Sequence, residues 1–207
     1  MSISPVSAAY APANTVTMPE HQAGDTILVF TFRNGSTIPS LVSGYTSLTT
    51  DHRAVGTGNW GARVAYKVAA SSSEVVGTWT NATSILVLVY RGVSVISGTY
   101  ATNKGTTSTT IVYPALTLTG TNQQSWVVRL VGASNVSTTT PDLTTNPLAG
   151  YVQRAGSATD ILALDTNGPV SSNPTADSQV TTSTTYWYTV TLELQAADST
   201  GSFFALF

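Results

Sequence analysis

The sequence has no cysteine and only two histidines among its 207 residues. Without cysteine the chain forms no disulfide, offers no thiol nucleophile and builds no thiolate zinc site. The absence does not identify a redox compartment, because disulfide-free proteins occur in all of them. Since the residue types that carry most enzyme chemistry are scarce, we expect a protein that is not an enzyme and that needs no cofactor.

Charge is also scarce, because 8 Lys+Arg and 10 Asp+Glu make up only 9% of the chain, against about 25% in an average globular protein. With a net charge of −2 and no Lys/Arg-rich run, the sequence lacks the basic surface that binds nucleic acid or an anionic membrane. No run of about 18 apolar residues occurs, so we expect no membrane insertion. The first 17 residues do not resemble a secretory signal, which predicts a protein that is not exported by that route.

Threonine and serine take the place of charged residues, with 36 Thr and 24 Ser in the chain. The branched Cβ of threonine suits a pleated strand, and its hydroxyl tolerates water. Apolar and polar residues alternate over residues 62–68 and 186–194, which predicts strands with one buried and one wet face. In the second strand we expect Thr189, Thr191 and Glu193 to face solvent.

Three segments are apolar at both odd and even positions, namely Ile27–Phe32, Ile85–Tyr90 and Trp126–Val131. This pattern predicts central strands that are covered on both faces or that contact a neighbouring subunit. Short stretches rich in Gly, Pro, Asn and Ser separate the strands, and no helical pattern of useful length is present. We therefore predict an all-β fold, a jelly-roll-like β-sandwich that forms a single domain over residues 20–207.

The chain also contains a weak internal repeat at an offset of about 100 residues. The corresponding pieces are Asp25–Phe32 and Ser125–Gly132, Gly44-Tyr45 and Gly150-Tyr151, Val64–Val68 and Ile161–Leu164, and Ser84–Arg91 and Thr185–Leu194. They define pseudo-halves at 20–98 and 111–200, with a Thr-rich bridge at 99–110. Chance convergence of Thr-rich strands is the alternative explanation.

The first half carries a set of short motifs over residues 20–95. They are Gly24-Asp25 before an apolar strand, Pro39 followed by Gly44-Tyr45-Thr46, Ala65-Tyr66-Lys67, Thr78-Trp79-Thr80, and a closing Tyr90-Arg91-Gly92-Val93. As a set they resemble a β-sandwich domain of tailed-bacteriophage virion proteins. The chain departs from that family at Tyr45, where the family has tryptophan, and in its longer spacing from Pro39.

The resemblance implies a non-enzymatic virion structural protein that is assembled in the cytoplasm of a bacterial host. A capsid decoration or cement protein is the first hypothesis, and a tail or fibre-attachment component is the alternative. The implied partners are further copies of the chain, with a trimer as a common form, and other virion proteins such as the major capsid protein or tail components.

The two termini favour assembly. Residues 1–19 have the composition of an extended arm, and residues 201–207 form an apolar tail. Subunits use such segments to clasp neighbours by strand addition, although the arm could instead dock on its own sheet edge. The predicted assembly residues are Pro5, Pro12, Pro19, Phe203, Phe204, Leu206 and Phe207.

A carbohydrate-binding module for host-surface glycans is the hypothesis from a different class. We expect most tryptophans in the core, but Trp60 lies in a Gly-rich loop, where it could be exposed together with Tyr45 and bind a glycan.

The sequence predicts no catalytic and no metal-binding residue. No Gly-x-Ser-x-Gly motif surrounds a serine, and no Asp-x-Asp spacing indicates calcium. We expect Asp25 to accept backbone N–H groups at the start of its strand and Arg91 to be solvated or ion-paired. Asp160 and Asp165 flank a short strand and are interpreted as solvated strand ends rather than as the carboxylate pair of a glycosidase.

Overall fold

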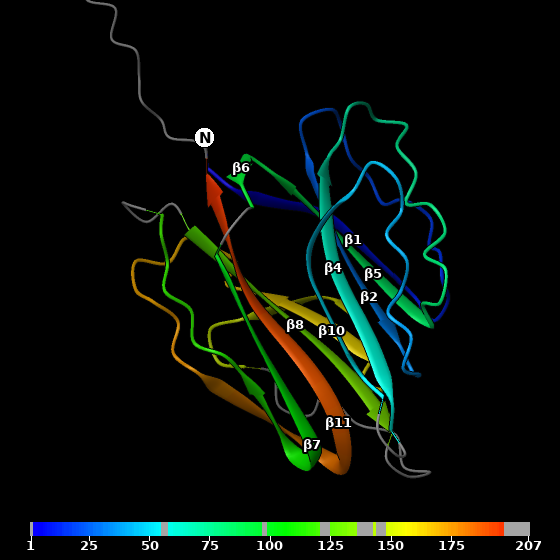
Figure 1. The fold of residues 1–207 in the computed structure, drawn as a ribbon. Helices are drawn as coiled ribbons and strands as arrows, with labels where there is room; N and C mark the ends of the chain where they lie inside the picture. Colours follow the sequence, from blue (N-terminus) through cyan, green and yellow to red (C-terminus); the bar gives the residue numbers. More distant parts are fainter. Residues whose placement is uncertain are drawn as a thin grey trace, which may run out of the picture.

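The computed structural model describes residues 2–54, 58–96, 99–120, 125–135, 143 and 148–196. These residues form two β-sheets that pack face to face, as Figure 1 shows. The first sheet has the strand order β1-β5-β2-β4-β3, with the bounds β1 Ser4–Ala11, β2 Thr26–Arg33, β3 Thr46–Arg53, β4 Trp60–Val68 and β5 Ser84–Arg91. The predicted all-β sandwich is confirmed.

The second sheet has the order β6-β11-β8-β10-β9, and β7 pairs with β11 beside this path. The bounds are β6 Val93–Val95, β7 Tyr100–Tyr113, β8 Ser125–Asn135, β9 Val152–Gly156, β10 Ile161–Asp165 and β11 Asp177–Ala196. The segment that we interpreted as a bridge, residues 99–110, is therefore mostly strand β7. That interpretation is wrong, because these residues pair with β11 instead of merely connecting the halves.

The two sheets have equivalent strand orders when β1, β2, β3, β4 and β5 are matched with β6, β8, β9, β10 and β11. The turn before β3 and the turn before β9 also agree. The amide of Tyr45 donates to the carbonyl of Val42 at 3.2 Å, and the amide of Tyr151 donates to that of Leu148 at 3.1 Å. This agreement favours a genuine repeat over chance convergence. Because each sheet consists of consecutive strands, the chain crosses between the sheets once, a simpler connectivity than a jelly roll.

The main core lies between the sheets and is filled by the inward-facing residues of both. The indole of Trp60 stacks on Tyr188, with ring centroids 5.2 Å apart, and on Phe32 at 6.3 Å. The sheets approach closely at Gly132, where an added Cβ would lie 2.3 Å from the ring of Phe32. A glycine is needed there because the densely packed core has no room for a side chain.

The outer faces of both sheets are also covered, so the central strands are buried on both sides as predicted. On the first sheet, Val16 and Met18 pack on a cluster that includes Trp79. On the second sheet, the C-terminal part of β7 contributes Ile111 and Tyr113 to a third cluster. The chain thus supplies its own cover for each sheet.

The predicted wet face of β11 is wrong for this reason. Thr189 and Thr191 are fully buried, and their hydroxyls donate to the carbonyls of Val112 at 2.8 Å and Pro114 at 2.9 Å. The backbone carbonyls of Val112 and Pro114 take the place of the water that the alternating pattern had suggested.

Glu193 is the third residue of this face, and only 2% of it is exposed. Its carboxylate accepts hydrogen bonds from the amides of Thr119 at 3.0 Å and Gly120 at 2.9 Å and from the hydroxyl of Ser125. Burial acts to raise the pKa of Glu193, but these hydrogen bonds outweigh it and hold the pKa below its usual range. The carboxylate of Glu193 therefore holds Thr119 and Gly120 against the second sheet.

The N-terminal residues are part of the domain. Ser4–Ala11 form β1, which pairs with β5 and has a bulge between Pro5 and Ser7. The segment that contains Pro12 and Pro19 continues over the outer face, where the amide of Trp79 donates to Asn14 at 2.8 Å. The extended arm therefore docks on the chain's own sheet, which was the alternative, and contact of Pro5, Pro12 and Pro19 with a neighbouring subunit stays a prediction. Phe203, Phe204, Leu206 and Phe207 lie outside the described residues.

Candidate functional site

An ion pair joins the first and last of the short motifs found in residues 20–95. The guanidinium of Arg91 donates two hydrogen bonds to the carboxylate of Asp25, from Nε to Oδ1 at 2.8 Å and from Nη2 to Oδ2 at 2.9 Å. Asp25 is almost completely buried and also accepts the amide of Gln22 at 2.9 Å. The predicted backbone bond of Asp25 and the predicted ion pairing of Arg91 are both confirmed, and the pair ties the start of β2 to the end of β5.

The Asp25–Arg91 pair should make folding sensitive to acid. Hydrogen bonding to Arg91 holds the pKa of Asp25 below its usual range, so the pair stabilises the fold fully above the unfolded-state pKa of about 3.9. This contribution is lost as the pH falls through the folded-state pKa. We expect Asp25→Asn to lower the free energy of unfolding at pH 7, and we expect the difference from wild type to shrink towards pH 2 to 3.

Urea unfolding across this pH range measures the effect. Asp51→Asn is the control, because Asp51 pairs with Lys104 at the surface, where an ion pair contributes little. If the two variants differ from wild type by the same amount at every pH, the role assigned to Asp25 is wrong.

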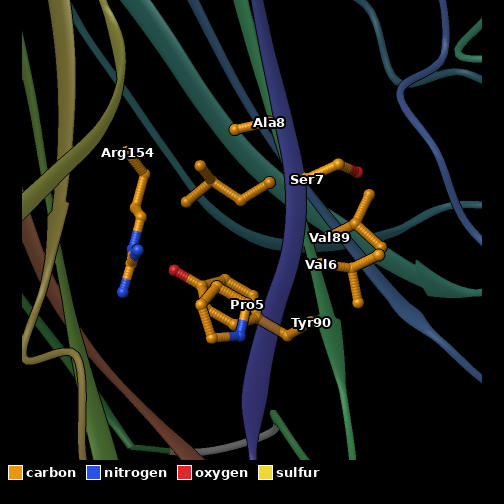
Figure 2. Close-up of a pocket in the computed structure, with 8 residues that line it drawn as sticks. Pro5, Val6, Ser7, Ala8, Val89, Tyr90 and Arg154 are labelled. Atoms are coloured by element: carbon orange, nitrogen blue, oxygen red, sulfur yellow. The ribbon is translucent and has the colours of Figure 1, made fainter.

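A cavity of about 230 Å³ lies between the edge strands β1 and β9, beside the bulge in β1. Figure 2 shows Arg154 across the cavity from Pro5, with Tyr90 near both. The lining consists of Pro5, Val6, Ser7, Ala8, Leu88, Val89, Tyr90 and Arg154. One of the predicted assembly residues, Pro5, therefore borders the cavity.

A buried polar cluster adjoins this cavity. Arg154 binds Asp165 through Nε to Oδ2 at 2.7 Å and Nη2 to Oδ1 at 2.8 Å. Asp165 is completely buried and also accepts the hydroxyl of Tyr90 at 2.8 Å. Burial, together with the neighbouring Asp165, raises the pKa of Tyr90 well above its usual range, so the phenol remains a donor. Tyr90 belongs to the first sheet, whereas Arg154 and Asp165 belong to the second. The hydrogen bonds of this cluster therefore connect the two sheets.

The interpretation of Asp165 as a solvated strand end is wrong, because Arg154 and Tyr90 bury and pair its carboxylate. Asp160, which precedes the opposite end of β10, is half-buried. Burial raises the pKa of Asp160 above its usual value.

The predicted exposure of Trp60 and Tyr45 is also wrong. Trp60 is fully buried at the start of β4, and only 6% of Tyr45 is exposed. Tyr45 packs edge-on against Trp79, with ring centroids 5.1 Å apart. All four tryptophans lie in the core, so neither Trp60 nor Tyr45 offers an exposed stacking platform for a sugar.

Nothing in the sequence indicates a second cavity, which has a volume of about 210 Å³ and lies between β3 and β7. It is lined by His52, Arg53, Trp60, Lys104, Gly105 and Thr106. About fifty residues separate the two strands in the chain, and they meet only because the second sheet packs on the first.

The structure offers no metal centre among the residues it describes, since no group of three or more His, Asp or Glu side chains is placed to hold an ion. Over the same residues, no helix is long and apolar enough to cross a bilayer. Comparisons with known protein families, with curated proteins and with solved structures find no match to this chain.

Proposed function

We propose that this chain is a non-enzymatic structural component of a tailed-bacteriophage virion, in the first place a capsid decoration protein that contacts the capsid or further copies of itself. The motifs that resemble the virion family support the proposal because they contact one another in the fold. Asp25 pairs with Arg91, and Tyr45 packs on Trp79. The motif set therefore acts as one structural unit in the first sheet.

The observation that carries the proposal is that positive charge is paired within the chain. Every lysine and arginine has a partner within the chain: Arg33 with Asn81, Arg53 with Tyr186, Arg63 with Pro39, Lys67 with Glu74, Arg91 with Asp25, Lys104 with Asp51, Arg129 with Asp177, and Arg154 with Asp165. Charged residues are depleted at the centres of protein interfaces. A surface of hydroxyls with few charges is therefore suited to burial against other subunits.

The edge strand β1 supports the same conclusion. It contains no charged residue, whereas soluble monomers often guard an edge strand with lysine. Pro5 and the adjacent bulge protect only the N-terminal end of this strand. The rest of the edge offers no electrostatic obstacle to a neighbouring subunit.

The proposal is tested on particles of the phage whose genome carries this chain. We expect the chain among the virion proteins identified by mass spectrometry, and its gene beside terminase, portal or major capsid genes. Absence of the chain from purified particles would overturn the proposal.

A truncation tests the predicted role of the apolar tail. We expect a chain that ends at Ser202 to keep the unfolding midpoint of wild type and to lose incorporation into particles. Val75→Ser is the matched control, because it removes an apolar side chain that is 71% exposed elsewhere on the surface. If the truncated chain is incorporated as well as the control, the tail has no part in assembly.

A further inference from the structure

We propose that His21 forms a pH-sensitive link between two segments that cover the outer face of the first sheet. One is the N-terminal covering segment, residues 12–21, and the other is the loop of residues 72–78 between β4 and β5. A neutral His21 joins the two segments, and a protonated His21 releases the loop. The inference concerns the fold itself, so it goes beyond the virion role and does not depend on it.

The two ring nitrogens of His21 have different partners, which fixes the position of the proton. Nδ1 lies 2.8 Å from the carbonyl oxygen of Pro19. A carbonyl oxygen only accepts, so Nδ1 carries the proton and donates it. Nε2 accepts the backbone amide of Glu74 at 3.1 Å. A neutral imidazole has one donor and one acceptor nitrogen, so this arrangement uses both and requires the neutral ring.

The bond between His21 and Glu74 spans a groove on the surface of the domain. The groove has a volume of about 540 Å³ and is lined by residues of both segments, His21 and Glu74 among them. A second bond joins the same segments where the hydroxyl of Thr15 donates to the carbonyl of Gly77 at 3.1 Å. The bond at Thr15 involves no group that titrates near neutral pH, whereas histidine does titrate there.

The carboxylates whose charge acts on His21 are already paired with other cations. They are Asp25 at the start of β2 and Glu74 in the loop. Arg91 at the end of β5 binds Asp25, and Lys67 at the end of β4 binds Glu74. Hydrogen bonds from these two cations hold the pKa values of both carboxylates below their usual range, so both stay ionised at pH 5. A proton on His21 therefore adds a positive charge to a set that is already balanced.

The covering segment itself offers little compensation for this charge. Glu20, the residue before His21, is exposed to solvent, where water screens a charge strongly. A proton on Nε2 of His21 would face the N–H group of Glu74, and two donors cannot bond to each other. Protonation therefore breaks the hydrogen bond and frees the loop from the covering segment at this point.

The first experiment is an NMR study of the full chain labelled with ¹⁵N, between pH 8 and pH 5. At pH 8 we expect the ring proton of His21 on Nδ1, and a ¹⁵N–¹⁵N scalar coupling between Nε2 and the amide nitrogen of Glu74. At pH 5 we expect this coupling to vanish and the protection of the Glu74 amide against hydrogen exchange to fall by about tenfold. A proton on Nε2 at pH 8, or a coupling that persists when the ring is protonated, would overturn the proposal.

The second experiment uses the fact that the chain has only two histidines. In His21→Gln the new side chain offers a donor and an acceptor but does not titrate, so we expect the protection of the Glu74 amide to be the same at pH 8 and pH 5. His52→Gln is the matched control, because His52 is exposed on β3, and we expect it to behave as wild type. If His21→Gln still loses protection at pH 5, or if His52→Gln no longer does, another group controls the loop and the proposal is wrong.

Discussion

Replacement of Arg154 by alanine is expected to lower the free energy of unfolding by about 3–5 kcal/mol, the usual cost of leaving a buried charge without its partner. Asp165 is completely buried, and Arg154 supplies both of its ionic contacts, at 2.7 and 2.8 Å. The hydroxyl of Tyr90 would still donate to the carboxylate, but a neutral donor cannot balance its charge. Urea unfolding at pH 7 measures the loss.

Lys104→Ala is the control for this result. It also breaks an ion pair, but 57% of the Lys104 side chain is exposed, so we expect a change of about 1 kcal/mol or less. Equal effects of the two variants would mean that burial of Asp165 does not determine the contribution of its ion pair.

Trp60→Ala is expected to lower the free energy of unfolding by about 3–5 kcal/mol, because it empties the centre of the main core. Trp60 is fully buried and stacks on Phe32 from β2 and on Tyr188 from β11. The substitution therefore removes contacts within the first sheet and between the two sheets. We expect a lower urea midpoint and a weaker near-ultraviolet circular dichroism signal.

Trp60→Phe keeps the prediction testable if the alanine variant does not fold, because it retains a ring and should lose less stability. Tyr100→Ala is the surface control, since 39% of Tyr100 is exposed and it lies outside this aromatic stack. If Trp60→Ala is no more destabilising than Tyr100→Ala, the stack does not contribute as its burial indicates.

Local patterns were sufficient to predict the central strands and two equivalent turns. Segments such as Ile27–Phe32 are apolar at both odd and even positions, and a strand of that kind is stable only where both of its faces are covered. Gly44-Tyr45 and Gly150-Tyr151 marked equivalent turns, and both glycines adopt positive φ, at 85° and 79°. Such a backbone conformation favours glycine over other residues, so the requirement is visible in the sequence.

The candidate sites were less predictable, because their members come from distant strands. Asp25 and Arg91 could be interpreted one at a time as strand ends. The hydrogen bond from the amide of Gln22 confirmed the interpretation of Asp25, and the ion pair confirmed that of Arg91. Asp165 was misinterpreted, because nothing near it in the sequence shows that Tyr90 of the other sheet lies above it. Trp60 was misinterpreted for the same reason, since its Gly-rich neighbours suggest a loop while its partner Tyr188 lies far along the chain.

The sequence by itself determined the central strands and which of their side chains share a face, because alternation along a strand is a local property of the backbone. Only the tertiary structure decided whether each face meets water. Thr189, Thr191 and Glu193 alternate with apolar residues as a wet face would, yet the C-terminal end of β7 and the segment after it cover them and supply their hydrogen-bond partners. Hydroxyls and carboxylates suit water and backbone groups equally well, so a Thr-rich pattern leaves this choice to the packing of distant segments.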